Sequence, residues 1–171
     1  MTSSVYIIGA PGSGKSTEMA QLLRGWGIGP YVRFTQREMF GHYMSSEKGL
    51  GAYLGHLRPE YPGTDALSLS VAPQAVSWLQ DTVPLLGLDW IYGEGARLSH
   101  MGFLNELAAC TDLTVIYLQV DPEEAARRRE ARGGKLLSDQ YCKIATTKAQ
   151  NVARACREAG IKVLERSSSL G

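Results

Sequence analysis

One stretch near the N-terminus has the residue types and the spacing of a phosphate-binding loop. The run Gly-Ala-Pro-Gly-Ser-Gly-Lys-Ser at 9–16 matches G-x-x-x-x-G-K-[ST] in full and follows the apolar run Val-Tyr-Ile-Ile. Backbone N–H groups in such a loop wrap around a phosphate chain, aided by the positive end of the following helix. We expect Lys15 to reach the β- and γ-phosphates and the Ser16 hydroxyl to bind Mg²⁺. The residues expected to contact ATP are Gly9, Ala10, Pro11, Gly12, Ser13, Gly14, Lys15, Ser16 and Thr17.

A carboxylate is expected beside this loop. Ligands of open α/β sheets lie beyond the carboxyl ends of the strands. Asp89 is the first residue of the expected strand Asp89–Gly93, so it lies at the amino end, away from the ligand. Glu94 comes directly after the carboxyl end of this strand, between two glycines. Glu94 can take a proton from an acceptor hydroxyl or hold a metal-bound water, and the alternative is a solvated loop glutamate. Asp121 also ends a strand, but the following Pro122 favours a helix-capping role.

A basic segment forms the third candidate cluster. Positioned arginines stabilise the charge that develops on a phosphoryl group in transfer. Arg128 and Arg132 are four residues apart and share a helix face, so we expect these two to be catalytic, with Arg129 as a third candidate. Gly133-Gly134 predicts a hinge for a short closing segment, or lid, over about 127–138. The alternative is a solvated helix in which the arginines pair with Glu123, Glu124 and Glu130.

The elements that would position these residues alternate between strands and helices. This order predicts an α/β fold with a five-stranded parallel sheet flanked by helices. The expected strands are Ser4–Gly9, Tyr31–Thr35, Asp89–Gly93, Leu113–Val120 and Ile161–Glu165. The expected helices are Lys15–Trp26, Pro73–Leu86, Ser99–Cys110, Pro122–Arg132 and Ser138–Ala159. The stretch 41–71 has weak periodicity and is interpreted as a substrate-covering insertion.

Composition sets the outer limits of the interpretation. The chain has 171 residues, 44% apolar and 20% charged, which suits one domain over 1–171. A net charge of +1 provides no overall field to hold nucleic acid nonspecifically. No apolar run is long enough for a membrane span, and three widely spaced cysteines argue against a disulfide framework or a zinc site. We therefore expect a cytoplasmic protein that is a monomer or a homodimer and has no membrane partner.

The phosphate loop, the strand-end carboxylate and the basic segment, in this order, resemble the P-loop nucleoside and nucleotide kinases. The run GAPGSGKST is similar to that of adenylate kinases, and LQVDPEEAARRREARG resembles the strand-to-lid passage of thymidylate kinases. The resemblance implies that Thr35, Arg37 and Arg97 bind the acceptor, and that Glu94 acts as the general base of deoxynucleoside kinases does. The run EGAR stands where adenylate kinases carry DGFPR, and the ERS tripeptide of deoxynucleoside kinases is absent. Phage-type kinases that act on a hydroxymethylated pyrimidine within DNA resemble the chain more loosely.

Three hypotheses follow. The first is an ATP- and Mg²⁺-dependent kinase of a nucleotide-type acceptor, which is a nucleoside, a nucleoside monophosphate or a hydroxyl on a modified pyrimidine in DNA such as 5-hydroxymethyluracil. In this hypothesis the 41–71 insertion forms the acceptor wall, with aromatic side chains stacking on a base. The second is a P-loop NTPase that acts as a nucleotide-dependent switch, although the N-K-x-D tetrapeptide that reads guanine is absent. The third is a kinase of nucleic acid that binds a strand through Arg24, Arg33, Arg37, Arg58 and the lid arginines.

Overall fold

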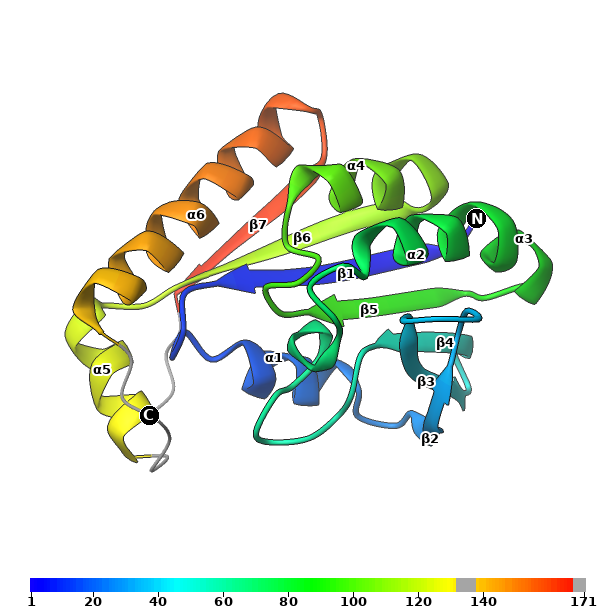
Figure 1. Cartoon of the computed structure of the whole chain (residues 1–171), viewed down its shortest axis with the longest axis horizontal. Helices are drawn as coiled ribbons and strands as arrows, with labels where there is room; N and C mark the ends of the chain where they lie inside the picture. The colour runs from blue at the N-terminus through cyan, green and yellow to red at the C-terminus, as the bar shows by residue number, and fades with distance from the viewer. Residues whose placement is uncertain (132–137, 168–171) are drawn as a thin grey trace.

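A seven-stranded sheet forms the centre of the computed structural model, which describes residues 1–131 and 138–167 (Figure 1). The strand order is β2-β3-β4-β5-β1-β6-β7, and the described strands all run in the same direction except β3. The strands are β1 (Ser3–Gly9), β2 (Gly27–Arg33), β3 (Phe40–Ser46), β4 (Gly49–Leu54), β5 (Trp90–Glu94), β6 (Asp112–Gln119) and β7 (Lys162–Ser167). The predicted α/β class and mostly parallel sheet are therefore confirmed, but the prediction of five parallel strands is wrong.

The two unpredicted strands, β3 and β4, lie in the stretch that was interpreted as an insertion. Their sequences, FGHYMSS and GLGAYL, are rich in glycine and serine, which have low strand propensity. They form a hairpin whose turn includes Gly49 at a φ of 111°, and β4 then pairs in parallel with β5. Pairing with distant neighbours, not local preference, makes these residues strands. Past β4 the stretch has one short 3-10 helix at Thr64–Ala66 and is otherwise irregular up to α2, as predicted.

The expected boundaries around β2 were also wrong. The helix α1 ends at Leu22 and not at Trp26, because Gly25 adopts a φ of 83° that breaks the helix. β2 begins at Gly27, four residues before its predicted start, and contains Pro30. A proline cannot donate to a strand ladder, but β2 is an edge strand and its register shifts between Ile28 and Tyr31.

The predicted helices are present, with one irregularity. They are α1 (Lys15–Leu22), α2 (Ala72–Ser77), α3 (Val83–Leu86), α4 (Met101–Cys110), α5 (Pro122–Ala131) and α6 (Asp139–Glu158). A π-helical turn at Trp78–Thr82 joins α2 to α3 within the predicted helix Pro73–Leu86. Pro84 has no N–H to donate to the Gln80 carbonyl, and we attribute the wider turn to this missing bond. The helix α4 begins at Met101, two residues after its predicted start at Ser99, and its N-cap is His100, whose Nδ1 accepts from the Phe103 N–H at 3.3 Å.

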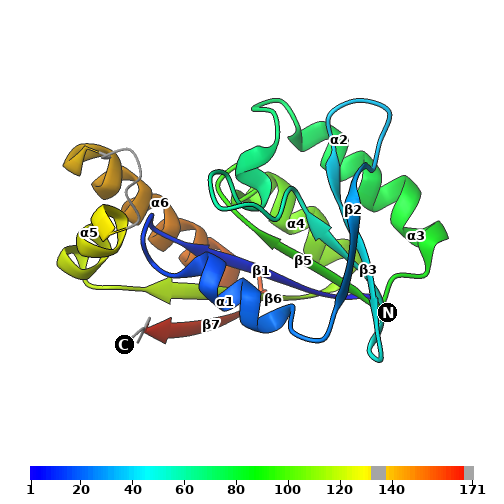
Figure 2. The ribbon, with the colours of Figure 1, turned by 90° about the horizontal axis from the view of Figure 1, so that it is seen from below.

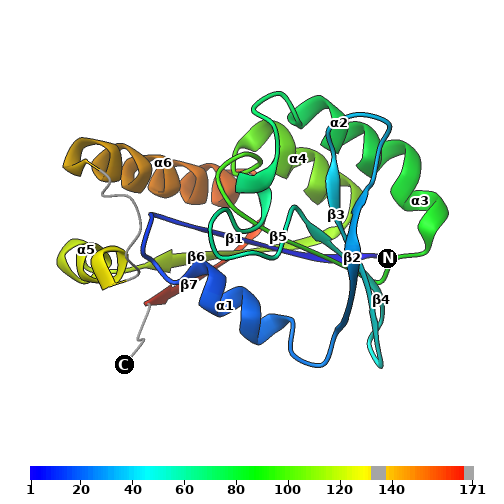
Figure 3. The ribbon, with the colours of Figure 1, turned by 60° about the horizontal axis from the view of Figure 1, so that its bottom comes forward.

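The helices form one layer on each side of the sheet. Figure 3 shows α1 on one side of β1, with α2, α4 and α6 on the other side. β6 lies between β1 and β7, and its Leu113, Val115 and Leu118 are buried. Figure 2 shows α5 and the N-terminal half of α6 beyond the carboxyl ends of β1 and β6. Among the described helices, none is both long and apolar enough to cross a membrane.

Candidate active site

The phosphate-binding loop lies where the sequence predicted it, between the end of β1 at Gly9 and the start of α1 at Lys15. Gly12 and Gly14 adopt φ values of 82° and 93°, which other residues rarely reach, and the Ser13 N–H donates to the Ala10 carbonyl at 3.1 Å. Gly14 occupies the N-cap and offers no side chain, so no side chain caps the first turn of α1. An uncapped helix start fits the phosphates of a nucleotide, because its N–H groups and dipole attract an anion.

The polar side chains of the loop differ in their burial and in their hydrogen-bond partners. The Lys15 ammonium donates to the Gly9 and Ala10 carbonyls at 2.8 and 3.1 Å, so its charge lies at the carboxyl end of β1. The Ser13 hydroxyl is buried, and its oxygen has no hydrogen-bond partner within the described parts of the chain. Ser16 and Thr17 are exposed in the first turn of α1. Ser16 is therefore accessible to a metal ion, as its predicted role requires.

Glu94 is the buried carboxylate of the site. It ends β5, the strand beside β1, and is only 2% exposed. Its Oε1 accepts a hydrogen bond from the Tyr53 hydroxyl at 3.0 Å, while Oε2 is buried and has no partner among the described residues. Burial raises the pKa of the Glu94 carboxyl, and the Asp65 charge adds to this, whereas the Tyr53 hydrogen bond and the Lys15 charge lower it. An unpaired carboxylate oxygen near a lysine charge can accept a proton, or it can accept a hydrogen bond from a metal-bound water.

The segment after β4 packs tightly over Glu94. Gly63 has a φ of 62°, and a Cβ there would lie 2.7 Å from Glu94 Cγ and 3.1 Å from the Tyr53 hydroxyl. A Cβ at Gly55 would lie 1.9 Å from the Gly63 carbonyl oxygen, so two glycines permit this approach. The Gly63 N–H donates to the His56 carbonyl at 2.8 Å, which closes the loop 56–63 at its base. The covering of Glu94 thus depends on backbone packed directly against it.

The turn after Glu94 is fixed by a network of hydrogen bonds. The buried Tyr6 hydroxyl donates to the Gly95 carbonyl at 2.7 Å, and Asp65 Oδ1 accepts from the Ala96 N–H at 2.7 Å. Burial raises the pKa of the Tyr6 phenol, so it remains a donor. Arg97, a predicted acceptor-binding residue, donates from Nε to the Leu67 carbonyl at 3.2 Å. The turn and the segment 63–67 are therefore held together as one wall of the site.

The helix α5 contacts the phosphate-binding loop directly. A Cβ at Gly12 would lie 2.6 Å from the Ala125 carbonyl oxygen, and the Arg129 guanidinium donates to the Pro11 carbonyl at 3.0 Å. Arg128 lies 3.2 Å from Glu124 and is 12% exposed, and the more exposed Arg127 pairs with the same carboxylate. Asp121 caps the helix, as predicted, by accepting from the Glu124 N–H at 3.3 Å.

The rest of the expected lid lies outside the described residues, which leaves out Arg132, Lys135 and the predicted hinge at Gly133-Gly134. Of the three arginines singled out in this segment, Arg129 is the one for which a contact with the phosphate-binding loop is observed. No sequence signal separates Arg129 from its neighbours, because three consecutive arginines differ only in the helix face they occupy.

Thr35 and Arg37 lie away from Glu94. They follow β2, which β3 and β4 separate from β5. Thr35 lines a hollow of about 600 Å³ together with residues of α2 and the π-helical turn, and its Oγ1 accepts from the Met39 N–H at 3.3 Å. Arg37 is exposed in the turn between β2 and β3. Their proposed contact with an acceptor therefore stays a prediction.

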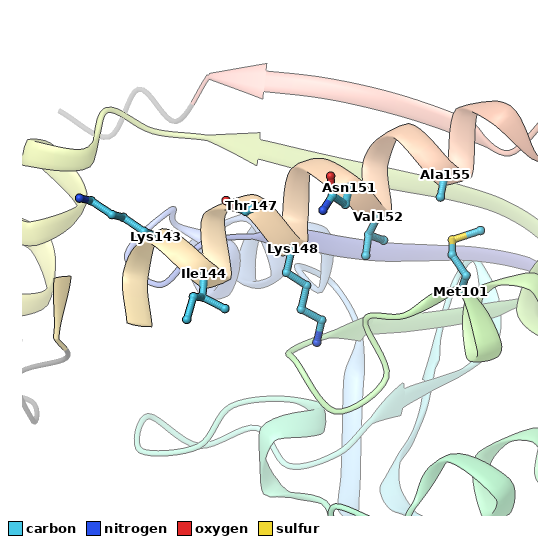
Figure 4. Close-up of a pocket in the computed structure, with 8 residues that line it drawn as sticks. All are labelled: Met101, Lys143, Ile144, Thr147, Lys148, Asn151, Val152 and Ala155. Atoms are coloured by element: carbon cyan, nitrogen blue, oxygen red, sulfur yellow. The ribbon is translucent and has the colours of Figure 1, made fainter. Parts of the chain in front are cut away.

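A second hollow, of about 620 Å³, lies along α6 (Figure 4). Apolar side chains such as Met101, Ile144 and Val152 form part of its wall, and Lys143 and Lys148 add positive charge. Figure 4 shows Lys148 extending from α6 toward the segment that precedes Met101. Burial and the Lys148 charge lower the pKa of the His100 imidazole, which caps α4 beside this hollow.

Sequence reasoning missed Tyr53, Gly63 and Asp65. Each contacts Glu94 or the turn after it, yet each lies 29 to 41 residues before Glu94 in the chain. The Pro62-Gly63 pair is a recognisable turn signal, but it does not reveal what the turn covers. Within the described residues no group of three or more His, Cys, Asp or Glu side chains gathers to hold a metal ion. A Mg²⁺ site at Ser16 and Glu94 would therefore need oxygens from the nucleotide as well.

Comparison with known proteins identifies a family for this chain. A family profile described as P-loop Nucleotide Kinase3 matches residues 1–166. No curated protein sequence matches significantly. Two solved structures of deoxyadenosine kinase from M. mycoides, with bound dATP and with bound dCTP, are similar at TM-scores of 0.48 and 0.49 and identities of 16% and 15%. The alignments cover 98% of this chain and 92% and 91% of those chains. Because the family profile spans nearly the whole chain, this protein belongs to the P-loop Nucleotide Kinase3 family and is a kinase.

Proposed function

We propose that this kinase transfers the γ-phosphoryl group of ATP to a hydroxyl of a nucleotide-type acceptor. The observation that carries the proposal is Glu94, buried at the carboxyl end of β5 with one oxygen held by Tyr53 and the other unpaired among the described residues. A carboxylate with a raised pKa is suited to accept a proton near neutral pH. A monophosphate acceptor would bring a second negative charge to this carboxylate, so Glu94 favours a hydroxyl.

The residues of the loop fit ATP with Mg²⁺. The uncapped start of α1, the glycine conformations and the exposed Ser16 hydroxyl provide N–H donors and a metal ligand. When bound, Mg²⁺ neutralises phosphate charge and orients the phosphoryl group. Lys15 would turn from the Gly9 and Ala10 carbonyls to the β- and γ-phosphates. Arg128 and Arg132, and Arg129 on its observed contact, would stabilise the charge that develops on the phosphoryl oxygens.

In the proposed step the acceptor oxygen attacks the γ-phosphorus while its proton passes to Glu94 Oε2. The bond between the γ-phosphorus and the bridging oxygen breaks, which leaves ADP and a phosphorylated acceptor. Because Gly63 and Tyr53 cover Glu94, the segment 55–66 must shift for an acceptor to reach this oxygen. Segment 41–71 would then form the acceptor wall, with Arg97, Thr35 and Arg37 as its predicted polar contacts. Holding a metal-bound water is the alternative role of Glu94.

An acceptor screen tests the proposal. Free nucleosides, nucleoside monophosphates and DNA oligomers, plain and with 5-hydroxymethyluracil, would be incubated with γ-labelled ATP and Mg²⁺. We expect label on a hydroxyl of one of these acceptors and none with the Lys15→Ala variant. Label on monophosphate groups alone would contradict a hydroxyl acceptor. Steady ATP hydrolysis without transfer to any acceptor would favour the nucleotide-dependent switch.

A further inference from the structure

Six aromatic and basic side chains gather at the β2 edge of the sheet. We call them the aromatic strip, and they are Tyr31, Arg33, Phe40, His42, His56 and Arg58. The Tyr31 ring centroid lies 5.4 Å from those of Phe40 and His42 and 4.2 Å from that of His56. The Arg33 guanidinium lies over the Phe40 ring at 5.3 Å from its centroid. At the other end Arg58 lies over the Tyr61 ring at 5.7 Å. Five of the six side chains are thus linked through the Tyr31 and Phe40 rings. Burial raises the pKa of the Tyr31 phenol, and Arg58 is near enough that its charge lowers this pKa.

The strand register places this strip on the same face of the sheet as Glu94. Tyr31 pairs with His42, His42 with Tyr53, and Tyr53 with Tyr92, so these four residues form one row across β2, β3, β4 and β5. Arg33 pairs with Phe40 two residues closer to the carboxyl end of β2. Glu94 is likewise two residues beyond Tyr92, so it lies on the same face and one step closer to the carboxyl ends. The strip therefore leads to the catalytic carboxylate.

Much of the strip is accessible. Arg33 and Arg58 are exposed, Tyr31 and Phe40 are half-buried, and Tyr61 is 60% exposed. On this face α1 packs against β1 and β5, away from β2 and β3 (Figure 3). The buried His42 fixes the arrangement, because its Nδ1 lies 2.9 Å from the Gly29 carbonyl and its Nε2 accepts from the Leu57 N–H at 3.3 Å.

Planar rings interleaved with guanidinium groups have the chemistry of a surface for single-stranded nucleic acid. Nucleobases stack on aromatic side chains, and arginines contact phosphates and stack on bases. Three strand spacings separate Tyr31 on β2 from Glu94 on β5, about 14 Å. Stacked nucleotides rise about 3.4 Å each, so this span is about four nucleotides long. A single nucleoside at Glu94 is too short to contact Tyr31.

We propose that the aromatic strip binds a segment of single-stranded polynucleotide, one nucleotide of which is the acceptor at Glu94. This inference rests on the proposed function, because it identifies the acceptor as part of a strand. Two exposed arginines allow about two phosphate contacts, so stacking would contribute most of the affinity.

A binding experiment tests the strip directly. Fluorescence anisotropy of a labelled 12-nucleotide single-stranded DNA would be measured with the full chain over a series of salt concentrations. We expect Tyr31→Ala to weaken binding about 10-fold or more, because one stacking partner is lost. The double variant Arg33→Gln/Arg58→Gln should lower the slope of log affinity against log salt by about 1.4, or about 0.7 for each phosphate contact. An RNA 12-mer in parallel shows which polynucleotide is preferred.

Two variants outside the strip serve as matched controls. Tyr141→Ala removes an exposed tyrosine from α6, and Arg157→Gln removes an arginine beside β7, at the opposite edge of the sheet from β2. Neither should change affinity or salt slope. If these controls weaken binding as much as the strip variants do, or if the 12-mer binds no more tightly than a mononucleotide, the proposal is wrong. A strip variant that instead dissociates a dimer in size-exclusion chromatography would assign the surface to a second copy of the chain.

Acceptor length separates this proposal from the proposed function. We expect kcat/KM to rise from a nucleoside to a tetranucleotide to a 12-mer that carry the same acceptor hydroxyl. In Arg33→Gln/Arg58→Gln the ratio of kcat/KM for the 12-mer to that for the nucleoside should fall at least fivefold. Equal ratios in the variant and the parent enzyme, with transfer intact, would overturn the strip and leave the kinase proposal standing. Loss of transfer to every acceptor in the parent enzyme would overturn both.

Discussion

Tyr53 donates a hydrogen bond from its hydroxyl to Glu94 Oε1 at 3.0 Å, which joins β4 to the carboxylate at the end of β5. Burial raises the pKa of the Tyr53 phenol, so this hydroxyl remains protonated and acts as the donor. The bond occupies one carboxylate oxygen and leaves Oε2 for another partner. If Glu94 takes the acceptor proton as proposed, Tyr53 is a positioning residue that acts through Glu94.

Replacing Tyr53 with phenylalanine tests this relationship. Because the hydrogen bond lowers the pKa of Glu94, its loss should raise that pKa further and move the acid limb of the kcat profile to higher pH. We also expect kcat at neutral pH to fall roughly 10- to 100-fold, the usual effect of losing a hydrogen bond to a charged group. The measurement is kcat against pH with a hydroxyl acceptor from the screen.

Tyr43→Phe is the matched control. Tyr43 lies on the adjacent strand β3, and its hydroxyl is 3.4 Å from the Trp78 indole nitrogen, on the face of the sheet opposite Tyr53. This variant should keep the parent pH profile. A shift of the acid limb in Tyr43→Phe but not in Tyr53→Phe would contradict the positioning role of Tyr53.

Glu94→Gln should affect activity and stability in opposite directions. Activity should fall by about 10²- to 10⁴-fold, because an amide cannot accept the acceptor proton. The raised pKa of Glu94 means that the folded state binds this proton more tightly than the unfolded chain. The stability that protonated Glu94 contributes is therefore fully present at a pH below the ordinary pKa of a carboxyl group. This stability is lost as the pH rises through the raised pKa of Glu94 in the folded state. We expect Glu94→Gln to have a higher Tm than the parent at pH 8. The difference in Tm between the two proteins should become smaller as the pH is lowered toward 4.

Calorimetry across this pH range provides the measurement. The exposed Glu60→Gln is the control, since it removes a carboxylate of the same kind without a burial cost. A Tm for Glu94→Gln that stays below the parent value at pH 8 would show that the charged form of Glu94 stabilises the fold.

Local sequence was sufficient to place the phosphate-binding loop after β1 and Glu94 at the carboxyl end of β5. The loop is a contiguous pattern, and Glu94 follows a buried strand between two glycines, so both can be read without knowledge of distant contacts. β3 and β4 could not be predicted in this way, because glycine-rich strands form through pairing with β2 and β5. The same non-local pairing brings Tyr53 and Gly63 to Glu94, which is why sequence reasoning missed both.

The acceptor residues carried over from the family resemblance show the same limit. Thr35 and Arg37 were expected at the end of a second strand near the site, on the assumption of five parallel strands. The hairpin of β3 and β4 inserts two strands between β2 and β5, which moves Thr35 to a hollow beside α2. The order of the motifs along the chain, which carries the family resemblance, therefore does not determine how many strands separate Thr35 and Arg37 from Glu94.

Arg129→Ala should weaken ATP binding. Arg129 donates to the Pro11 carbonyl and so holds α5 against the phosphate-binding loop. Loss of this partly buried charged hydrogen bond should raise the KM for ATP about tenfold. The control is Arg127→Ala, because Arg127 lies two positions away on α5, is 74% exposed and pairs only with Glu124 among the described residues. Exposed ion pairs contribute little, so its KM should match that of the parent. Equal KM values in both variants would show that the contact with Pro11 does not support the loop.

Gly63→Ala should disrupt the covering of Glu94. A Cβ at Gly63 would lie 2.5 Å from the Glu94 carbonyl oxygen, and the φ of 62° and ψ of −137° at this residue form a conformation that residues other than glycine disfavour. The clash and the strain together should cost roughly 2–5 kcal/mol in the free energy of unfolding. The variant should also have a lower kcat per folded molecule, because Glu94 and Tyr53 must move together to make room.

Gly87→Ala is the reference for a strained alanine that makes no clash. Gly87 has a φ of 64° and a ψ of 36°, and a Cβ there meets nothing within 4 Å, so this variant should cost about 1 kcal/mol and keep the parent kcat per folded molecule. Urea unfolding and activity at equal folded concentration measure both effects. A kcat per folded molecule in Gly63→Ala equal to that of the parent would show that Gly63 has no part in positioning Glu94.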